Sequence, residues 1–229
     1  MLKLIQLELI KYKINGYVRV ALIAMACIFG LICLIAFNRS EGQAFQDSET
    51  LFFAIDTFTK GTFIVFASVL LSRFIIDEYR TKSITVLFMY PINRKKLMIA
   101  KLFIVFSFTF ISIVLCNLIV GSLMLLLNHF YEFMNETLTV GQVGRQALAI
   151  IMNALAASFI SLIPLFFGMR KYSTAATIIT SVLIVIAIYN VSDGFSLNSI
   201  VVIPIALSWI GAIIAYASFR NIERKDINP

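Results

Sequence analysis

Histidine and cysteine are scarce in this sequence. Its 229 residues include one His and three Cys. A zinc site needs three or four nitrogen, sulfur or carboxylate ligands held close together, and a triad hydrolase needs a histidine beside its nucleophile. His129 is the single histidine of the sequence. A metalloprotease and a triad hydrolase are therefore excluded, and we expect neither a metal site nor catalytic residues.

A phosphate-binding loop is also missing. Such a loop has the pattern Gly-x4-Gly-Lys-Ser/Thr, because closely spaced glycines let backbone amides surround a phosphate. The chain has 10 Gly, and none of them falls in this pattern. The chain alone therefore does not hydrolyse ATP.

Charge is rare and apolar residues are abundant. Only 14% of the residues are charged and 60% are hydrophobic, and the mean hydropathy is +0.94. A transmembrane helix needs about 20 mostly apolar residues to cross about 30 Å of hydrocarbon. Six apolar runs meet this need, at residues 17–37, 51–76, 100–127, 142–168, 173–190 and 197–219. We expect an all-α membrane protein with six transmembrane helices in a single domain, residues 1–229.

Basic residues are distributed unevenly about these runs. Of the 19 Lys and Arg residues, all but Arg39, Lys60 and Arg145 lie on one side of the predicted arrangement. Lys and Arg are retained on the cytoplasmic face of a membrane. This asymmetry predicts a multi-pass protein of the cell membrane with both termini in the cytoplasm. It also accounts for the net charge of +7 without a nucleic-acid partner.

The two ends of the chain flank the spans. Residues 1–16 mix apolar and polar side chains, which one helix can separate into two faces. We expect an interfacial helix in the lipid headgroups, rather than a signal peptide, since the segment is too polar for a signal-peptide core. Residues 17–219 hold the spans, and 220–229 form a cytoplasmic tail. The expected apolar face has Leu2, Ile5, Leu9 and Tyr12, and the polar face has Lys3, Gln6, Glu8, Lys11 and Lys13.

Charged residues interrupt the second apolar run. Asp56 and Lys60 are four residues apart, so they share a helix face and can pair. Arg73 is expected to anchor the inner membrane interface. Two interpretations of the pair stay open: a structural ion pair at the outer boundary, or part of an outer gate that contacts an amphipathic substrate. The residues of this candidate gate are Phe52, Phe53, Asp56, Lys60, Phe63 and Phe66.

The longest connection between spans covers residues 77–99. Asp77 and Glu78 favour a helix start, where exposed amides attract negative charge. Pro91 disfavours helix at the preceding residue, and Asn93 is a suitable cap for a second helix. We expect a short amphipathic helix, a break, and a basic re-entry in which Arg94 and Lys101 reach the membrane edge. The residues alone leave open whether this helix rests on lipid or docks a cytosolic partner.

The same connection resembles the signature of the ABC-2 (type-2 exporter) permease family. The residues that carry the resemblance are Glu78, Lys82, Ser83, Leu87, Pro91, Ile92, Asn93, Arg94, Leu97, Ala100 and Lys101. The match departs at Lys82, where Gly is commonest in the family, and at Asn93, where Ser is commonest. The amphipathic N-terminus, six spans and cytoplasmic termini also resemble the family layout.

This resemblance implies the membrane-spanning subunit of an ATP-driven exporter. Such a permease pairs with a second copy or another permease, contacts membrane lipids, and rests on two cytosolic ATP-binding subunits that supply ATP and Mg²⁺. Residues 77–90 would form the coupling helix, with Glu78, Arg80 and Lys82 facing the ATPase, and the N-terminal helix would be a second docking surface. The implied coupling residues are Asp77, Glu78, Arg80, Lys82, Leu87, Pro91 and Arg94.

The small, Ile- and Phe-rich chain resembles bacterial peptide, bacteriocin and immunity permeases within that family. The resemblance implies outward movement of an amphipathic or toxic substrate, such as an antimicrobial or cytolytic peptide, from the cytoplasm or inner leaflet. The alternative is an ion-driven secondary carrier that uses Asp56. No two halves of the sequence look like the inverted repeats with broken helices that are typical of carriers, which favours the exporter.

Overall fold

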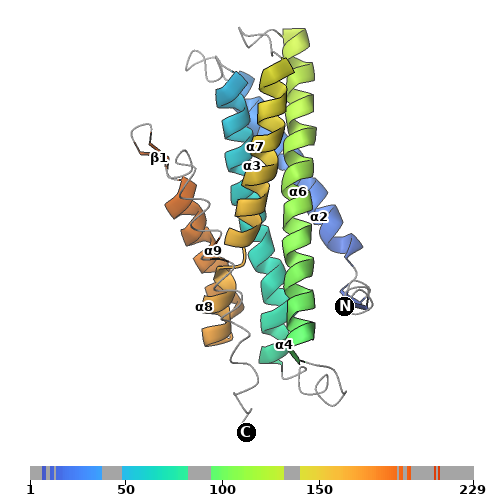
Figure 1. Cartoon of the computed structure of the whole chain (residues 1–229), viewed down its shortest axis with the longest axis vertical. Coiled ribbons are helices and arrows are strands. Elements are labelled where there is room, and N and C mark those ends of the chain that lie inside the picture. Colours follow the sequence, from blue (N-terminus) through green and yellow to red (C-terminus); the bar gives the residue numbers. More distant parts are fainter. Residues whose placement is uncertain are drawn as a thin grey trace. The chain divides into compact units, whose positions relative to one another are not determined.

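The described part of the structure is helical apart from one short β ladder. The computed structural model describes residues 7–8, 11–12, 14–37, 48–81, 94–131, 140–189, 191–192, 195–196, 209 and 211. The ladder pairs β1 (Val191–Ser192) with β2 (Phe195–Ser196) in antiparallel fashion. The helices are α2 (Asn15–Phe37), α3 (Ser48–Leu71), the π-helix η2 (Ser72–Ile76), α4 (Asp77–Arg80), α6 (Arg94–Tyr131), α7 (Val140–Ile160), α8 (Pro164–Lys171) and α9 (Thr174–Tyr189) (Figure 1).

Four helical stretches are long and apolar enough to cross a membrane: residues 15–37, 49–80, 96–130 and 144–170. They contain nearly all of the first four predicted spans. The fifth predicted span corresponds to α9, whose 16 residues reach about 24 Å at 1.5 Å per residue. The predicted sixth span, apart from Trp209 and Gly211, and the predicted tail lie outside the described residues. The structure thus supports a multi-pass helical membrane protein, with four long spans in the part that it describes.

The chain forms two compact units. Unit 1 comprises residues 1–14, 64–110 and 156–229, and unit 2 comprises residues 15–63 and 111–155. The long helices α3 and α6 contribute residues to both units. Residues 1–229, expected from the sequence to form one domain, thus comprise two compact units.

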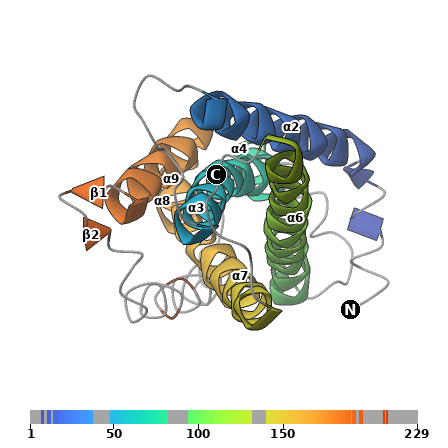
Figure 2. The ribbon, with the colours of Figure 1, turned by 90° about the horizontal axis from the view of Figure 1, so that it is seen from above.

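The described part of unit 2 is built from four helices. Its parts of α3, α6 and α7 lie side by side in both views (Figure 1, Figure 2). The fourth helix, α2, contacts α6, since the Cys33 thiol of α2 lies 3.8 Å from the Met124 sulfur of α6. A small residue allows close packing inside this unit, because a Cβ at Gly121 would come 3.1 Å from the Phe52 ring.

Unit 1 packs the later part of α3, η2 and α4 against the first part of α6 and against α8 and α9. Helices α8 and α9 pack on each other, and both contact η2. A Cβ at Gly168 of α8 would collide with the side chains of Thr177 and Ile76. The Ser181 hydroxyl of α9 donates to Ser68 of α3 at 2.9 Å. This unit therefore has a tightly packed core around η2.

The passage from α3 to α4 is continuous. Ile76, which precedes α4, has right-handed helical angles (φ −67°, ψ −42°) and no side-chain cap. The prediction that a helix starts at Asp77 is therefore wrong: the acidic residues extend the preceding helix to Arg80. The predicted short helix beyond that point falls on residues 82–93, which lie outside the described part. The start of α6 at Arg94, directly after Asn93, agrees with the predicted cap position.

The fourth span is interrupted. Residues 161–163 form a turn between α7 and α8, and Pro164 occupies the first turn of α8, where its missing N–H costs nothing. Tyr172 closes α8 with a left-handed backbone (φ 46°) and donates its N–H to the Gly168 carbonyl. Ser173 then accepts the Ala176 N–H at 3.4 Å as the cap of α9. The break predicted near residues 169–172 is thus confirmed.

Candidate functional site

A buried ion pair ties α6 to α4 inside unit 1. The Lys101 ammonium contacts Glu78 directly and also donates to the Phe74 carbonyl at 2.9 Å. Lys101 is 2% exposed and Glu78 is 8% exposed. Breaking a buried pair by removing one partner is far more costly than breaking a surface pair. The pair therefore fixes the end of α4 firmly to α6.

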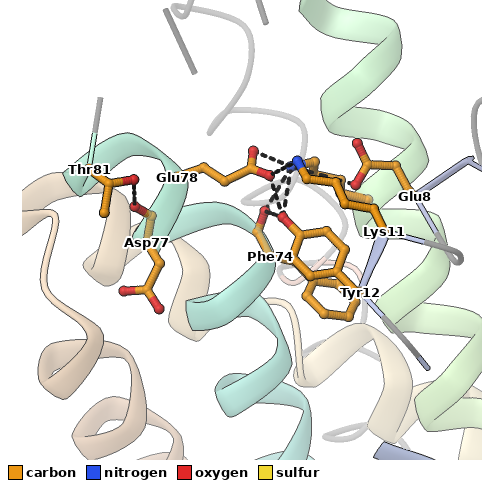
Figure 3. A network of polar contacts seen from close by, with 8 residues as sticks. Glu8, Lys11, Tyr12, Phe74, Asp77, Glu78 and Thr81 are labelled. Carbon is orange, nitrogen blue, oxygen red and sulfur yellow. Dashed lines mark hydrogen bonds and ion pairs between the residues drawn. The ribbon is translucent and has the colours of Figure 1, made fainter. Parts of the chain in front are cut away.

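The N-terminal segment reaches the same carboxylate. Lys11 pairs with Glu78 Oε1 at 2.7 Å, and the Tyr12 hydroxyl donates to that oxygen (Figure 3). The Tyr12 ring also stacks on the Phe74 ring, with centroids 4.1 Å apart. Glu78, near the end of α4, thus contacts side chains from both the N-terminal segment and α6. We call Glu8, Lys11, Tyr12, Phe74, Glu78 and Lys101 the Glu78 network.

The π-helical turn supplies part of this arrangement. In η2 the N–H of Asp77 bonds to the Ser72 carbonyl, which is the five-residue spacing of a π-helix. The Phe74 carbonyl lies within this turn and accepts the bond from Lys101. Short π-helical turns inside longer helices are frequent at functional sites. The turn places a backbone acceptor and the Glu78 carboxylate beside the same ammonium.

A second carboxylate lies beside Lys101. Glu8 Oε2 is 3.9 Å from Lys101 Nζ, beyond hydrogen-bond distance, and no hydrogen bond to it is formed within the described part of the chain. The bond from the Tyr12 N–H to the Glu8 carbonyl, at 3.1 Å, places both side chains on one helical turn. Burial raises the pKa of the Glu8 carboxyl above its ordinary value, Lys101 and Lys11 oppose this rise, and Glu78 adds to it.

These positions correct part of the sequence interpretation. Glu78 was expected to face an ATPase beside Arg80 and Lys82, but its carboxylate is directed into unit 1, Asp77 is half-buried, and Arg80 is exposed. Successive residues of an α-helix are about 100° apart, so positions 78 and 80 lie on opposite sides. Lys82, Leu87 and Pro91 lie outside the described residues, as does the side chain of Arg94.

Sequence reasoning also missed the inward role of Lys101 and Glu8. Lys101 was expected at the membrane edge and Glu8 on the polar face of an interfacial helix, yet both are buried, while the apolar Leu7 is exposed. One signal was available for Lys101: it lies four residues after Leu97 and three before Ile104, and both of these apolar side chains are buried. No local signal indicated Glu8, because its partner is distant in the sequence.

A second polar cluster lies in unit 2. Lys60 pairs with Asp56, as the spacing predicted, and both residues are buried. Asn153 of α7 donates to Asp56 Oδ2 at 3.1 Å, and Asn117 of α6 interacts with the same carboxylate. The ion pair therefore sits among three helices, and the two amides that support it were not predicted.

The phenylalanines of the candidate outer gate differ in exposure and in the unit to which they belong. Phe63 is 0% exposed, whereas Phe53 is 41% exposed. Phe52 packs near Gly121, and Phe66 belongs to unit 1, where it stacks on Phe108. Residues that are consecutive on a helix point in different directions. The gate phenylalanines of unit 2 therefore do not form a single aromatic wall.

Comparison with known proteins identifies the family of this chain. Residues 4–188 match the family model described as ABC-2 family transporter protein. The chain belongs to the ABC-2 transporter family. As an ABC-2 protein it is a membrane component of an ABC transporter, and such components work with separate ATP-binding subunits.

A curated relative matches nearly the whole chain. The chain is 41% identical to the uncharacterized protein YcbO of Bacillus subtilis (strain 168), over 227 residues that make up 98% of this ABC-2 protein and 100% of YcbO. No solved structure matches.

Proposed function

We propose that this ABC-2 protein is the permease subunit of an ATP-driven exporter, coupled to its ATPase through the segment that begins at α4. The observation that carries this proposal is the Glu78 network. It fixes α4 to α6 and to the N-terminal segment, and the Tyr79 ring adds a contact with Tyr172 at 6.0 Å between centroids. A force applied to α4 is thereby passed to the long helices, since buried charged contacts resist separation.

The exposed basic residues indicate which end of unit 1 the ATPase would bind. Five basic residues in the described part of unit 1 are exposed: Lys11, Arg73, Arg80, Lys96 and Arg170. Arg80 ends α4, Lys96 lies in the first turn of α6, and Arg170 lies in the last turn of α8. Retention of basic residues in the cytoplasm supports a cytoplasmic location for this end of unit 1 and, as part of the proposal, for both chain termini.

The remaining parts of the proposal concern assembly and substrate. The permease pairs with a second copy or another permease and binds two ATPase subunits that provide ATP and Mg²⁺. The substrate is an amphipathic or toxic molecule, with an antimicrobial or cytolytic peptide as the class the resemblance favours. The burial of Asp56 and Lys60, with Asn153 as a further partner, favours a structural role for that pair over contact with substrate.

The test is purification of the chain from native membranes in mild detergent, followed by identification of co-purifying proteins and an ATPase assay. We expect a P-loop ATPase in roughly equal amount. Arg80→Glu should reduce ATP turnover without reducing membrane insertion, because it reverses an exposed charge at the end of α4. The matched control is Arg145→Glu, the same change at an exposed position of unit 2. A chain that purifies without an ATPase, and whose transport follows an ion gradient, would instead be a secondary carrier.

A further inference from the structure

The connection between α8 and α9 is a sharp turn that contains a strained residue. Tyr172 has a left-handed backbone (φ 46°) and is the one non-glycine residue with a positive φ in the described part of the chain. A bulky residue rarely adopts this conformation, and it persists only where the surrounding structure enforces it. Here Gly168 of the preceding turn has no room for a side chain between Thr177 and Ile76. We call residues 170–173 the α8–α9 elbow, and this packing fixes its shape.

The elbow lies beside α4, on which the proposed coupling depends. The Tyr172 and Tyr79 rings have centroids 6.0 Å apart, and α8 and α9 both contact η2, which runs directly into α4. The last turn of α8 and α4 lie at the same end of unit 1 (Figure 1). Two connections between spans, far apart in the sequence, therefore present their side chains next to each other.

The exposed side chains at this end have one sign of charge. Arg80 at the end of α4 and Arg170 in the elbow are exposed, and Tyr172 is 40% exposed. The three acidic residues in the described part of unit 1 are buried or half-buried. Arginine and tyrosine are also among the residues that contribute most to binding at protein interfaces. The elbow and α4 together therefore fit an acidic protein surface.

An anionic lipid headgroup would also match two arginines, but the tyrosine does not fit that partner. Tyrosines of an aromatic belt sit at the level of the headgroups, which requires the ring to face lipid. The Tyr172 ring lies against Tyr79 of α4 instead. A rigid elbow whose ring points to α4 is better suited to a protein partner that contacts α4 as well.

We propose that the α8–α9 elbow is an additional contact surface for the ATP-binding subunit: Arg170 and Arg80 pair with acidic residues of that subunit, and Tyr172 packs on the same surface. This rests on the proposed function, because the partner is the ATPase that couples through α4. The elbow is packed on η2, and α4 is fixed to α6 by the Glu78 network. The ATPase would therefore act on both connections as one rigid piece.

The first experiment is photo-crosslinking of the complete complex in native membranes. A p-benzoylphenylalanine residue replaces Tyr172 in the elbow or, as a marker for the α4 segment, the exposed Thr81. The matched control is the same replacement at Phe130, an aromatic residue of unit 2 that is 77% exposed. We expect positions 172 and 81 to crosslink to the P-loop ATPase, identified by mass spectrometry, and position 130 not to do so.

The second experiment titrates the purified ATPase onto the chain in lipid nanodiscs. Arg170→Glu should weaken binding by about tenfold, because it places like charges opposite each other, and it should reduce the sensitivity of binding to salt. Arg145→Glu, the same change in unit 2, should bind as the wild type does. Tyr172→Gly should also weaken binding without lowering the thermal unfolding midpoint, because glycine takes the left-handed conformation without strain.

Two results would overturn the role of the elbow and leave the proposed function standing. One is crosslinking of the ATPase from position 81 while position 172 reacts only with lipid or not at all. The other is wild-type affinity and salt dependence in Arg170→Glu. Failure to recover any ATPase with the wild-type chain would overturn the proposed function itself, and the role of the elbow with it.

Discussion

Lys101 illustrates how one side chain can dominate a small region. Its charge is buried beside two carboxylates and one backbone carbonyl. The sequence places it seven residues after Arg94, where a lysine at the membrane edge looks the same as a buried one. Only its partners, 23 and 89 residues away for Glu78 and Tyr12, distinguish the two.

Replacement of Lys101 should therefore be costly. We expect Lys101→Met to lower the free energy of unfolding by about 3–5 kcal/mol, because Glu78 and Glu8 then lose their buried counter-charge. The double variant Lys101→Met with Glu78→Gln should recover part of this loss. Thermal unfolding of the detergent-purified chain measures both effects.

Lys96→Met is the control for that substitution, since Lys96 is on the same helix but exposed. It should change stability by less than about 0.5 kcal/mol. If the Lys101 and Lys96 variants were equally stable, the buried network would contribute nothing measurable.

Among the elements, the contact of α8 with α9 and η2 is the most crowded. Gly168→Ala should destabilise unit 1 by about 1–3 kcal/mol, because its new methyl group would collide with Thr177 and Ile76 in a packed core. Adding Thr177→Ala should relieve much of the collision. Unfolding midpoints of the single and double variants measure the cost and its relief.

Gly30 provides the matched comparison. It lies inside α2, and a Cβ there would have no neighbour within 4 Å among the described residues. Gly30→Ala should therefore be neutral or stabilise by up to about 1 kcal/mol through helix propensity alone. A destabilisation equal to that of Gly168→Ala would contradict the packing explanation.

The sequence was sufficient to predict that the long helices exist, but not where each of them ends or which way their charged side chains point. Of the six predicted spans, the first four correspond to the four long helical stretches, because a span must be apolar over its whole length, and Asn93 marked the start of α6, which depends on local backbone chemistry. The continuation of α3 through η2 into α4 was missed, because Asp77 and Glu78 stabilise a helix equally well as its start or as its extension. The inward direction of Glu78 depends on contacts with residues far away in the sequence, which local patterns do not contain.

For the whole molecule, orientation in the membrane is the property most open to direct measurement. In a version with Cys27, Cys33 and Cys116 replaced, single cysteines at positions 80 and 170 should react with an impermeant maleimide only from the cytoplasmic side. A cysteine at position 145 should react only from the outside. The prediction follows from the retention of Lys and Arg in the cytoplasm, and labelling of intact cells against inverted vesicles tests it.

Labelling of positions 80 and 145 from the same side would contradict the six-span arrangement, since it would require a different number of crossings between them. Labelling of position 80 from outside would also move the α4 segment away from any cytosolic ATPase. The experiment therefore tests the topology and the docking side together, independently of any substrate.

The π-helical turn at Ser72–Ile76 also bears on how this protein can change by insertion and deletion. A π turn holds one residue more than the α-helical turn that it replaces. Deleting one residue from this stretch would restore a regular α-helix and keep the turns on either side in nearly the same phase, so the acidic side chain would still reach Lys101. A descendant of this gene that lost that residue would therefore keep the same ion pair, whereas loss of one residue from the regular helix before or after the turn would rotate one partner by about 100° and separate the two.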